Sequence, residues 1–294
     1  MVPVFYKIEN HVAWVVGNKV SKHDYRKYPS KVIHFDFSKV EPKFLKPYHI
    51  TPLACLIHEY QQQGFYIKVR GCSDAMHTLL SSFNFINFCK GESAVIPLQK
   101  DKFTHPLWLI KQLENSSYID AVTNYFQNTF LPNQDLFAVG NALGELFNNI
   151  FDHSNSKIPG YTFTKFIPER NQIILSVCDF GIGIPKKINT YLQKIGHEKL
   201  SSTDALKHAT ELAVSSKSQP HNAGRGLDTI RTSIKSLSGK ILIVSNNAIL
   251  WIKGDGSEQL VSIRENFKGT LFVIWIDTTH LPLTEELTEE ISIV

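Results

Sequence analysis

Residues 141 to 153 read Asn141-Ala-Leu-Gly-Glu145-Leu-Phe-Asn-Asn149-Ile-Phe-Asp-His153, and they combine a helical pattern with a line of polar side chains. The periodicity predicts a helix over residues 134 to 152, with Asn133 as its N-cap. At roughly 100° per residue, one arc of this helix collects the large apolar side chains, which are Leu136, Val139, Leu143, Leu146, Phe147 and Ile150. We expect this arc to face the protein core.

Glu145, Asn149 and His153 form a separate stripe on the same helix, because each follows the previous one by four residues. Ala138 and Ala142 flank the stripe, and their small side chains leave room for a ligand. A carboxylate and an amide one turn apart can hold a hard cation and orient a water molecule. The solvated face of an ordinary amphipathic helix has the same pattern, so both interpretations stay open.

The second informative segment is Val177-Cys-Asp179-Phe-Gly181-Ile-Gly183. The residues from 172 to 177 are nearly continuous in apolar side chains, which predicts a buried strand that ends beside Asp179. The two glycines then predict a sharp turn. A carboxylate at a strand end can accept a hydrogen bond from an exocyclic amine such as that of adenine. A tight turn capped by an aspartate would give the same sequence.

A third segment, Ala223-Gly224-Arg225-Gly226-Leu227, precedes a predicted helix that continues to about residue 237. Glycines before a helix bring its backbone N–H groups and the positive end of its dipole close to a phosphate. A flexible loop that enters a helix is the alternative interpretation.

The last segment is Gly269-Thr270, which opens an apolar run over residues 271 to 276. This run predicts a central strand of a sheet, with Thr270 at the border of the same site.

In this order, the four segments resemble the GHKL ATPase superfamily. This group contains DNA gyrases, a class of heat-shock chaperones, histidine kinases, mismatch-repair ATPases and anti-sigma-factor serine kinases. The resemblance covers roughly residues 115 to 280. It implies an α/β fold of the α+β sandwich type, in which helices cover one face of a Bergerat-type mixed sheet. ATP and Mg²⁺ are the implied cofactors.

The resemblance also implies a role for each matching residue. Asn149 would be the Mg²⁺ ligand, and Glu145 would be the catalytic residue, either as a general base for hydrolysis or, as in the kinases, as an organiser of the metal and its waters. Asp179 would bind the adenine amine directly and through water. The other implied nucleotide-binding residues are His153, Gly181, Gly183, Gly224, Gly226, Leu227 and Thr270. Of these, Gly181 and Gly183 would shape the adenine pocket and the hinge of a lid.

This chain departs from the superfamily pattern in two places. The segment around Gly224 has fewer glycines than in some members, because His221-Asn222-Ala223 stands where they carry a further glycine. Residues 1 to 110 also lack the pattern of a helical hairpin with a phosphoacceptor histidine, which argues against a histidine autokinase. Residues 185 to 222 are expected to form the lid over the phosphates, with a helix over about residues 203 to 214.

The first part of the chain predicts a small α/β unit. Strands are expected at residues 12 to 16, 32 to 37, 65 to 69 and 94 to 97, and helices at residues 52 to 62 and 73 to 82. The unit resembles a STAS domain, in which a Ser or Thr at a helix N-terminus can be phosphorylated. Thr51 takes the comparable place, where it is equally explained as an N-cap before Pro52, and Ser38 is a second candidate. The predicted domains are residues 1 to 105 and 106 to 294.

Composition agrees with a two-domain cytoplasmic protein. The chain has 294 residues, a hydrophobic content of 43% and a formal net charge of +4. No apolar run approaches the roughly 20 residues that span a bilayer, and we expect no membrane contact. Four scattered cysteines favour reduced thiols. A basic cluster that includes Lys19, Arg26 and Lys31 could touch an acidic partner or nucleic acid, although such a cluster is more often a solvated loop.

The sequence therefore predicts a Mg²⁺-dependent ATP-binding protein. It would act either as an ATPase or as a serine/threonine protein kinase of the anti-sigma type. The alternative is a non-catalytic interaction module whose lid closes on ATP and changes which partner it holds. The expected partners are ATP or ADP, a regulatory protein and a second copy of the chain, and nothing in the sequence indicates nucleic acid as a partner.

Overall fold

The structure is a computed structural model that describes residues 2–3, 31–91, 102–110, 115–153, 155–215 and 225–284. The strands predicted at residues 12 to 16 and 94 to 97, Gly224 and the basic cluster before Lys31 lie outside these residues. In the part of the chain that is described, no helix is both long and apolar enough to cross a membrane.

The N-terminal unit contains a parallel sheet of three strands in the order β1-β2-β3. The strands are β1 (Val2–Pro3), β2 (Val32–Asp36) and β3 (Tyr66–Arg70), and the helical elements are η3 (Pro42–Phe44), α2 (Pro47–Gln62), α3 (Asp74–Ser82) and α4 (Phe85–Cys89). Helix α2 connects the parallel strands β2 and β3, as a parallel pair requires. The predicted alternation of strands and helices is therefore confirmed between residues 32 and 82.

Helix α2 begins at Pro47, five residues before the predicted start, so the prediction that Thr51 is an N-cap is wrong. Pro47 takes the first turn, where its missing N–H costs nothing, and the His49 ring accepts a hydrogen bond from the Lys46 backbone N–H at 3.0 Å. Thr51 instead lies inside the helix with Pro52 after it, and its side chain is fully buried. A phosphate could not reach Thr51 in this fold, whereas Ser38 is exposed.

The larger sheet has five strands in the order β4-β5-β6-β8-β7. They are β4 (Thr104–Leu109), β5 (Tyr161–Ile167), β6 (Gln172–Asp179), β7 (Lys240–Ile252) and β8 (Glu258–Asp277). Every pairing between these strands is antiparallel, so the prediction of a mixed sheet is wrong for the described residues. Short connections account for two of these pairings, because β5–β6 and β7–β8 are joined by turns that reverse the chain. The broader assignment to the α+β class is confirmed.

Strand β7 reverses near Asn246. The rings of Trp251 and Trp275 stack with centroids 5.5 Å apart, although Trp275 pairs with Lys240 at the other end of β7. A straight strand would separate residues 240 and 251 by roughly 35 Å. Asn246 has a positive φ of 48°, and the pairing with β8 shifts register there. Strand β8 has a corresponding break at Gly269, where φ is 78°.

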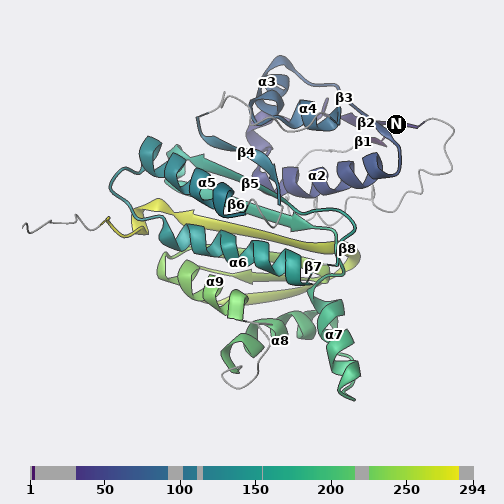
Figure 1. Cartoon of the computed structure of the whole chain (residues 1–294), viewed down its shortest axis with the longest axis vertical. Helices are drawn as coiled ribbons and strands as arrows, with labels where there is room; N and C mark the ends of the chain where they lie inside the picture. Colours follow the sequence, from purple (N-terminus) through teal and green to yellow (C-terminus); the bar gives the residue numbers. More distant parts are fainter. Residues whose placement is uncertain are drawn as a thin grey trace, which may run out of the picture.

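One face of the larger sheet is covered by α5 (Asn115–Phe130), α6 (Phe137–His153) and α9 (Arg225–Ser236), which lie side by side in Figure 1. The predicted apolar arc of α6 is confirmed, because Val139, Leu143, Leu146, Phe147 and Ile150 are all buried. Asn133 does not cap this helix. The carboxylate of Asp135 accepts a hydrogen bond from the Phe137 backbone N–H at 2.8 Å, and the helix begins there.

The opposite face of the sheet is covered by α2 of the N-terminal unit, so the helices do not lie on one face alone. The hydroxyls of Thr51 and Ser176 are 2.7 Å apart, and the Cys55 thiol donates to the carbonyl of Cys178 at 3.4 Å. One hydrophobic core includes α2, β2 and this face of the larger sheet. The predicted division of the chain at residue 105 stays a prediction, and the core is continuous across it.

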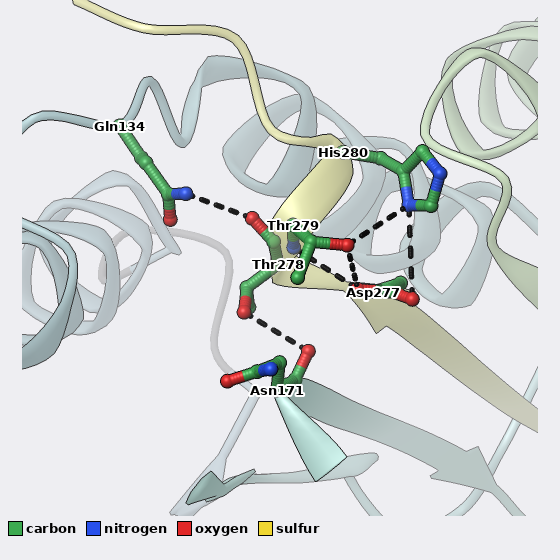
Figure 2. Close-up of polar contacts among 6 residues, drawn as sticks. All are labelled: Gln134, Asn171, Asp277, Thr278, Thr279 and His280. Carbon is green, nitrogen blue, oxygen red and sulfur yellow. Dashed lines mark hydrogen bonds and ion pairs between the residues drawn. The ribbon is translucent and has the colours of Figure 1, made fainter.

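The far end of the sheet fixes the loop before α6 (Figure 2). The Gln134 side chain donates to the carbonyl of Thr278 at 2.9 Å, and the Thr278 hydroxyl donates to the carbonyl of Asn171 at 2.9 Å. Asp277 accepts from the backbone N–H of Thr279 at 3.0 Å. These bonds join the end of β8 to the start of α6, so they set where α6 begins relative to the sheet.

Two helices follow β6 before the chain returns to the sheet. They are α7 (Ile184–Lys194) and α8 (Ser202–Ser215), and the second agrees with the helix predicted at residues 203 to 214. The Asn189 side chain donates to the carbonyl of Leu200 at 2.9 Å and accepts from its N–H at 2.8 Å. These two bonds hold the connection between α7 and α8. Leu206 of α8 joins the core beneath α6 and α9.

Candidate functional site

Three polar side chains form a row across neighbouring strands at one end of the sheet. Asp179 of β6 pairs with Thr270 of β8, which in turn pairs with Ser245 of β7. Side chains alternate along a strand, and Val177 and Phe272 belong to the core beneath α6 and α9. The row therefore faces the same side of the sheet as these helices. Asp179, Thr270 and Ser245 are all buried.

The carboxylate of Asp179 is buried but receives backbone hydrogen bonds. Burial raises its pKa to about 7, although the N–H groups of Gly181 and Thr270 favour the charged form and oppose this rise. The Gly181 N–H donates to Oδ1 at 2.7 Å. A buried carboxylate of this kind is suited to accept a further hydrogen bond from a polar N–H group, because such a donor offsets the cost of its charge.

The turn after Asp179 requires a glycine at position 183. Gly183 has a φ of 81°, and a Cβ there would meet the Asn246 side chain at 2.6 Å. Gly269 also has a positive φ, and a Cβ there would collide with the backbone of Asp179. The predicted turn is therefore confirmed, and it packs directly against the breaks in β7 and β8.

Glu145 and Asn149 lie half-buried on the flank of α6 that faces away from α5. Gly140 and Gly144 mark the α5 flank, where Ile119 lies 3.2 Å and 3.7 Å from their ideal Cβ positions. At roughly 100° per residue, Glu145 and Asn149 point to the opposite side, towards α9. The Asn149 side-chain N–H donates to the carbonyl of Glu145 at 2.9 Å, which leaves the amide oxygen as the atom that could bind a cation.

The end of α6 and the end of β6 lie at the same edge of the sheet. Gly160, which precedes β5, shows this directly, because its ideal Cβ would lie 2.7 Å from the Ile150 side chain and 3.1 Å from the Cys178 carbonyl. Asn149 precedes Ile150, and Asp179 follows Cys178. The cation-binding candidate and the buried carboxylate therefore belong to one region of the molecule.

The N-terminus of α9 points to this edge as well. Helix α9 ends at Ser236, close to Lys240, which pairs with Trp275 at the far end of the sheet. Its 12 residues span about 18 Å, which carries its first turn back to the edge with Asp179. Gly226 and Leu227 belong to this first turn, and Gly224 lies outside the described residues. His153 ends α6, but its side chain is outside the description.

The sequence interpretation missed Ser245 and Asn246. Both are buried, and both hydrogen-bond to the start of α7: the Ile184 N–H donates to Ser245 Oγ at 2.9 Å, and the Lys186 N–H donates to Asn246 Oδ1 at 3.2 Å. The available signal was the Ser-Asn-Asn interruption within the apolar run of residues 241 to 252.

The described residues contain no group of three or more His, Cys, Asp or Glu side chains that could hold a metal ion. A Mg²⁺ ion at Asn149 would therefore need oxygens from a bound phosphate and from water, as Mg²⁺ in nucleotide sites commonly does. The amide oxygen of Asn149 and the nearby carboxylate of Glu145 fit such a site.

No protein-family model matches this chain, and no curated protein matches it.

The buried charge of Asp179 predicts a pH-dependent stability. The ordinary pKa is 3.8, and the folded-state pKa is about 7. Between these values the folded protein holds a proton that the unfolded chain has released, so stability falls as pH rises from about 4 to about 7. An Asp179→Asn variant lacks this penalty. Relative to the parent, we expect its free energy of unfolding to rise by up to about 4 kcal/mol over this window, at about 1.4 kcal/mol per pH unit.

Urea denaturation at pH 4.5, 6 and 8 would measure this difference. Asp120→Asn, at an exposed position on α5, is the matched control and should keep the parental pH dependence. An Asp179→Asn variant whose stability follows the parent at all pH values would contradict the raised pKa of the buried Asp179.

Proposed function

We propose that this chain is a Mg²⁺-dependent ATP-binding protein of the GHKL type that hydrolyses ATP or transfers its γ-phosphate to a serine or threonine of a partner. The observation that carries the proposal is the meeting of three features at one sheet edge. These are the buried carboxylate of Asp179, the polar flank of α6 with Glu145 and Asn149, and the N-terminus of α9.

The adenine end of the site would be formed by Asp179 and Thr270. The exocyclic amine of adenine is a donor that a buried carboxylate can accept, whereas guanine presents a carbonyl oxygen at the same position of the ring. A carboxylate facing that oxygen would gain no hydrogen bond and would repel it. The turn through Gly181 and Gly183 would border the base, since the Gly181 N–H is already bound to Asp179.

The phosphate end of the site would lie between α6 and the first turn of α9. The positive end of the α9 dipole and the N–H groups of its first turn favour a phosphate. Mg²⁺ would neutralise phosphate charge there. Asn149 would supply a protein oxygen for the metal, and Glu145 would orient or deprotonate the attacking water or hydroxyl. Gly226 and Leu227 lie in the first turn of α9 and would border the phosphates.

The proposal predicts selectivity for adenine nucleotides. Titration calorimetry with Mg²⁺ should give a dissociation constant for ATP at least about tenfold lower than for GTP, since one charge-assisted hydrogen bond is worth roughly 1.5–3 kcal/mol. Asp179→Asn should lose most of this difference, and Asp120→Asn should retain it. Equal affinity of the parent protein for ATP and GTP would overturn the assignment of Asp179.

One contact favours the second candidate function, an ATP-gated interaction module. Lys268, beside the break in β8, forms an ion pair with Glu59 of α2 and lies 5.6 Å from the centre of the Phe180 ring. Phe180 follows Asp179, so the N-terminal unit touches the segment that frames the base site. A change at Asp179 on ATP binding could thus alter the surface that α2 and its neighbours offer to a regulatory protein or a second copy of the chain.

A further inference from the structure

We infer that Asn246 is a positioning residue that holds the hinge at Gly183 and fixes the direction of helix α7. The hydrogen bonds that support this inference are independent of any ligand. Its consequence for ATP binding rests on the proposed function, because α7 begins immediately after the turn that borders Asp179.

Helix α7 has no cap of its own. Its N-cap position is Gly183, which has no side chain to accept a hydrogen bond from the first turn. The first N–H groups of a helix have no partner within the helix and must find one elsewhere. A serine, threonine, aspartate or asparagine at the N-cap normally supplies that partner.

Strand β7 supplies the missing cap from outside the helix. Ser245 Oγ accepts from the Ile184 N–H at 2.9 Å, and Asn246 Oδ1 accepts from the Lys186 N–H at 3.2 Å. The other half of the Asn246 amide donates to the carbonyl of Ile182 at 3.2 Å. The same side chain therefore binds the backbone on both sides of Gly183, and it spans the hinge.

An asparagine meets both requirements of this position. Its amide offers one donor and one acceptor at the distance of the two backbone groups. Asn246 also has a φ of 48°, which asparagine tolerates better than most residues. The Asn246 side chain packs closely against Gly183, because a Cβ on Gly183 would lie 2.6 Å from it.

The cap is connected to the row that contains Asp179. Ser245 Oγ donates to the carbonyl of Gly269 at 2.9 Å and lies 3.0 Å from the Thr270 hydroxyl. Thr270 pairs with Asp179 across the two strands. A displacement of α7 would break the bond from Ile184 to Ser245, whose hydroxyl also contacts Thr270. The direction of α7 is therefore coupled through Ser245 to the base end of the site.

The inference is tested by removing the Asn246 side chain without straining its backbone. Asn246→Gly keeps the positive φ accessible and deletes both hydrogen bonds. Asn247→Gly is the matched control, because the Asn247 side chain bonds to the carbonyls of Ile263 and Arg264 and not to the hinge. Asn246→Asp keeps the acceptor for Lys186 but cannot donate to Ile182, and it should give an intermediate result.

The first measurement is hydrogen exchange, without nucleotide, of the backbone amides of Ile184, Lys186 and Lys187, since Pro185 has no N–H. We expect exchange to be about tenfold faster in Asn246→Gly, because the loss of a helix cap costs roughly 0.5–2 kcal/mol of stability. Exchange should be unchanged in Asn247→Gly. Equal protection of these amides in the parent and in Asn246→Gly would overturn the inference.

The second measurement is ATP affinity by calorimetry. Asn246→Gly should bind ATP about tenfold more weakly than the parent, and Asn247→Gly should bind it equally well. If the parent protein binds no ATP, the proposed function fails, and the exchange experiment alone still decides the role of Asn246. A third outcome is that the parent binds ATP and that Asn246→Gly exchanges faster but binds ATP as tightly as the parent. Asn246 would then hold the hinge without affecting nucleotide binding, which contradicts the coupling to the site.

Discussion

Asn149→Ala is expected to abolish the Mg²⁺-dependent part of ATP binding. Asn149 lies on the flank of α6 that faces α9. Its side-chain N–H donates to the carbonyl of Glu145, and its amide oxygen takes no part in that bond. Removing it takes away the one uncharged protein oxygen of the proposed site and leaves a divalent ion with phosphate oxygens, water and the Glu145 carboxylate. Titration calorimetry with ATP in Mg²⁺ and in EDTA should show a large difference for the parent and none for the variant.

The adjacent Asn148 provides the control for this experiment. It has the same side chain on the same helix but is exposed to solvent on another face. Asn148→Ala should therefore retain the full effect of Mg²⁺ on ATP binding. If Asn149→Ala responds to Mg²⁺ as strongly as Asn148→Ala does, the metal is held elsewhere, and the cation-binding role of the stripe on α6 is wrong.

The elements that were predicted well are those whose pattern is local. The apolar arc of α6 repeats with the helical period, and the apolar run of β6 ends at Asp179 and two glycines. Each signal depends only on neighbours in sequence. The glycine turn was predictable for the same reason, because Gly183 has a backbone conformation that other residues rarely adopt.

The helix starts were predicted less well, because several residues compete for each cap. Asn133 and Asp135 both have side chains that can cap a helix, and it is Asp135 that accepts the hydrogen bond from the first turn. The Gln134 side chain between them bonds to the end of β8, a contact that local sequence does not specify. Thr51 before Pro52 has a common sequence for a helix start, but Pro47 lies one turn earlier and starts the helix first. The burial of Thr51 follows from the contact of α2 with β6, which local sequence does not specify.

Ser245 and Asn246 were missed because their function is non-local. They lie about 60 residues after the helix that they cap, with Ile184 and Ser245 separated by 61 positions. Their sequence shows only polar side chains within an apolar strand, which equally suits a bulge or an edge. The antiparallel order of the larger sheet is non-local in the same way, since it depends on which strands pair with β6 and β8.

Glu145→Gln is expected to reduce ATP hydrolysis by on the order of 10²-fold or more, as for the loss of a positioned general base. ATP affinity should change little, because the substitution keeps the size of the side chain and leaves Asn149 and Asp179 in place. Release of phosphate under multiple turnover and calorimetry on the same samples would separate these two effects. Glu169→Gln, at an exposed position beyond the far end of β5, should behave as the parent in both measurements.

The outcome also separates the candidate functions from one another. An ATPase loses hydrolysis in Glu145→Gln and keeps binding. A protein kinase shows little hydrolysis in the parent but transfers the γ-phosphate to a protein, and transfer should fall in the variant. An ATP-gated module binds ATP and shows neither activity, while the Glu59–Lys268 contact changes with nucleotide. Hydrolysis by Glu145→Gln at the parental rate would show that the carboxylate on α6 takes no part in the chemistry, because no other half-buried acid lies on the flank of α6 that faces α9 within the described residues.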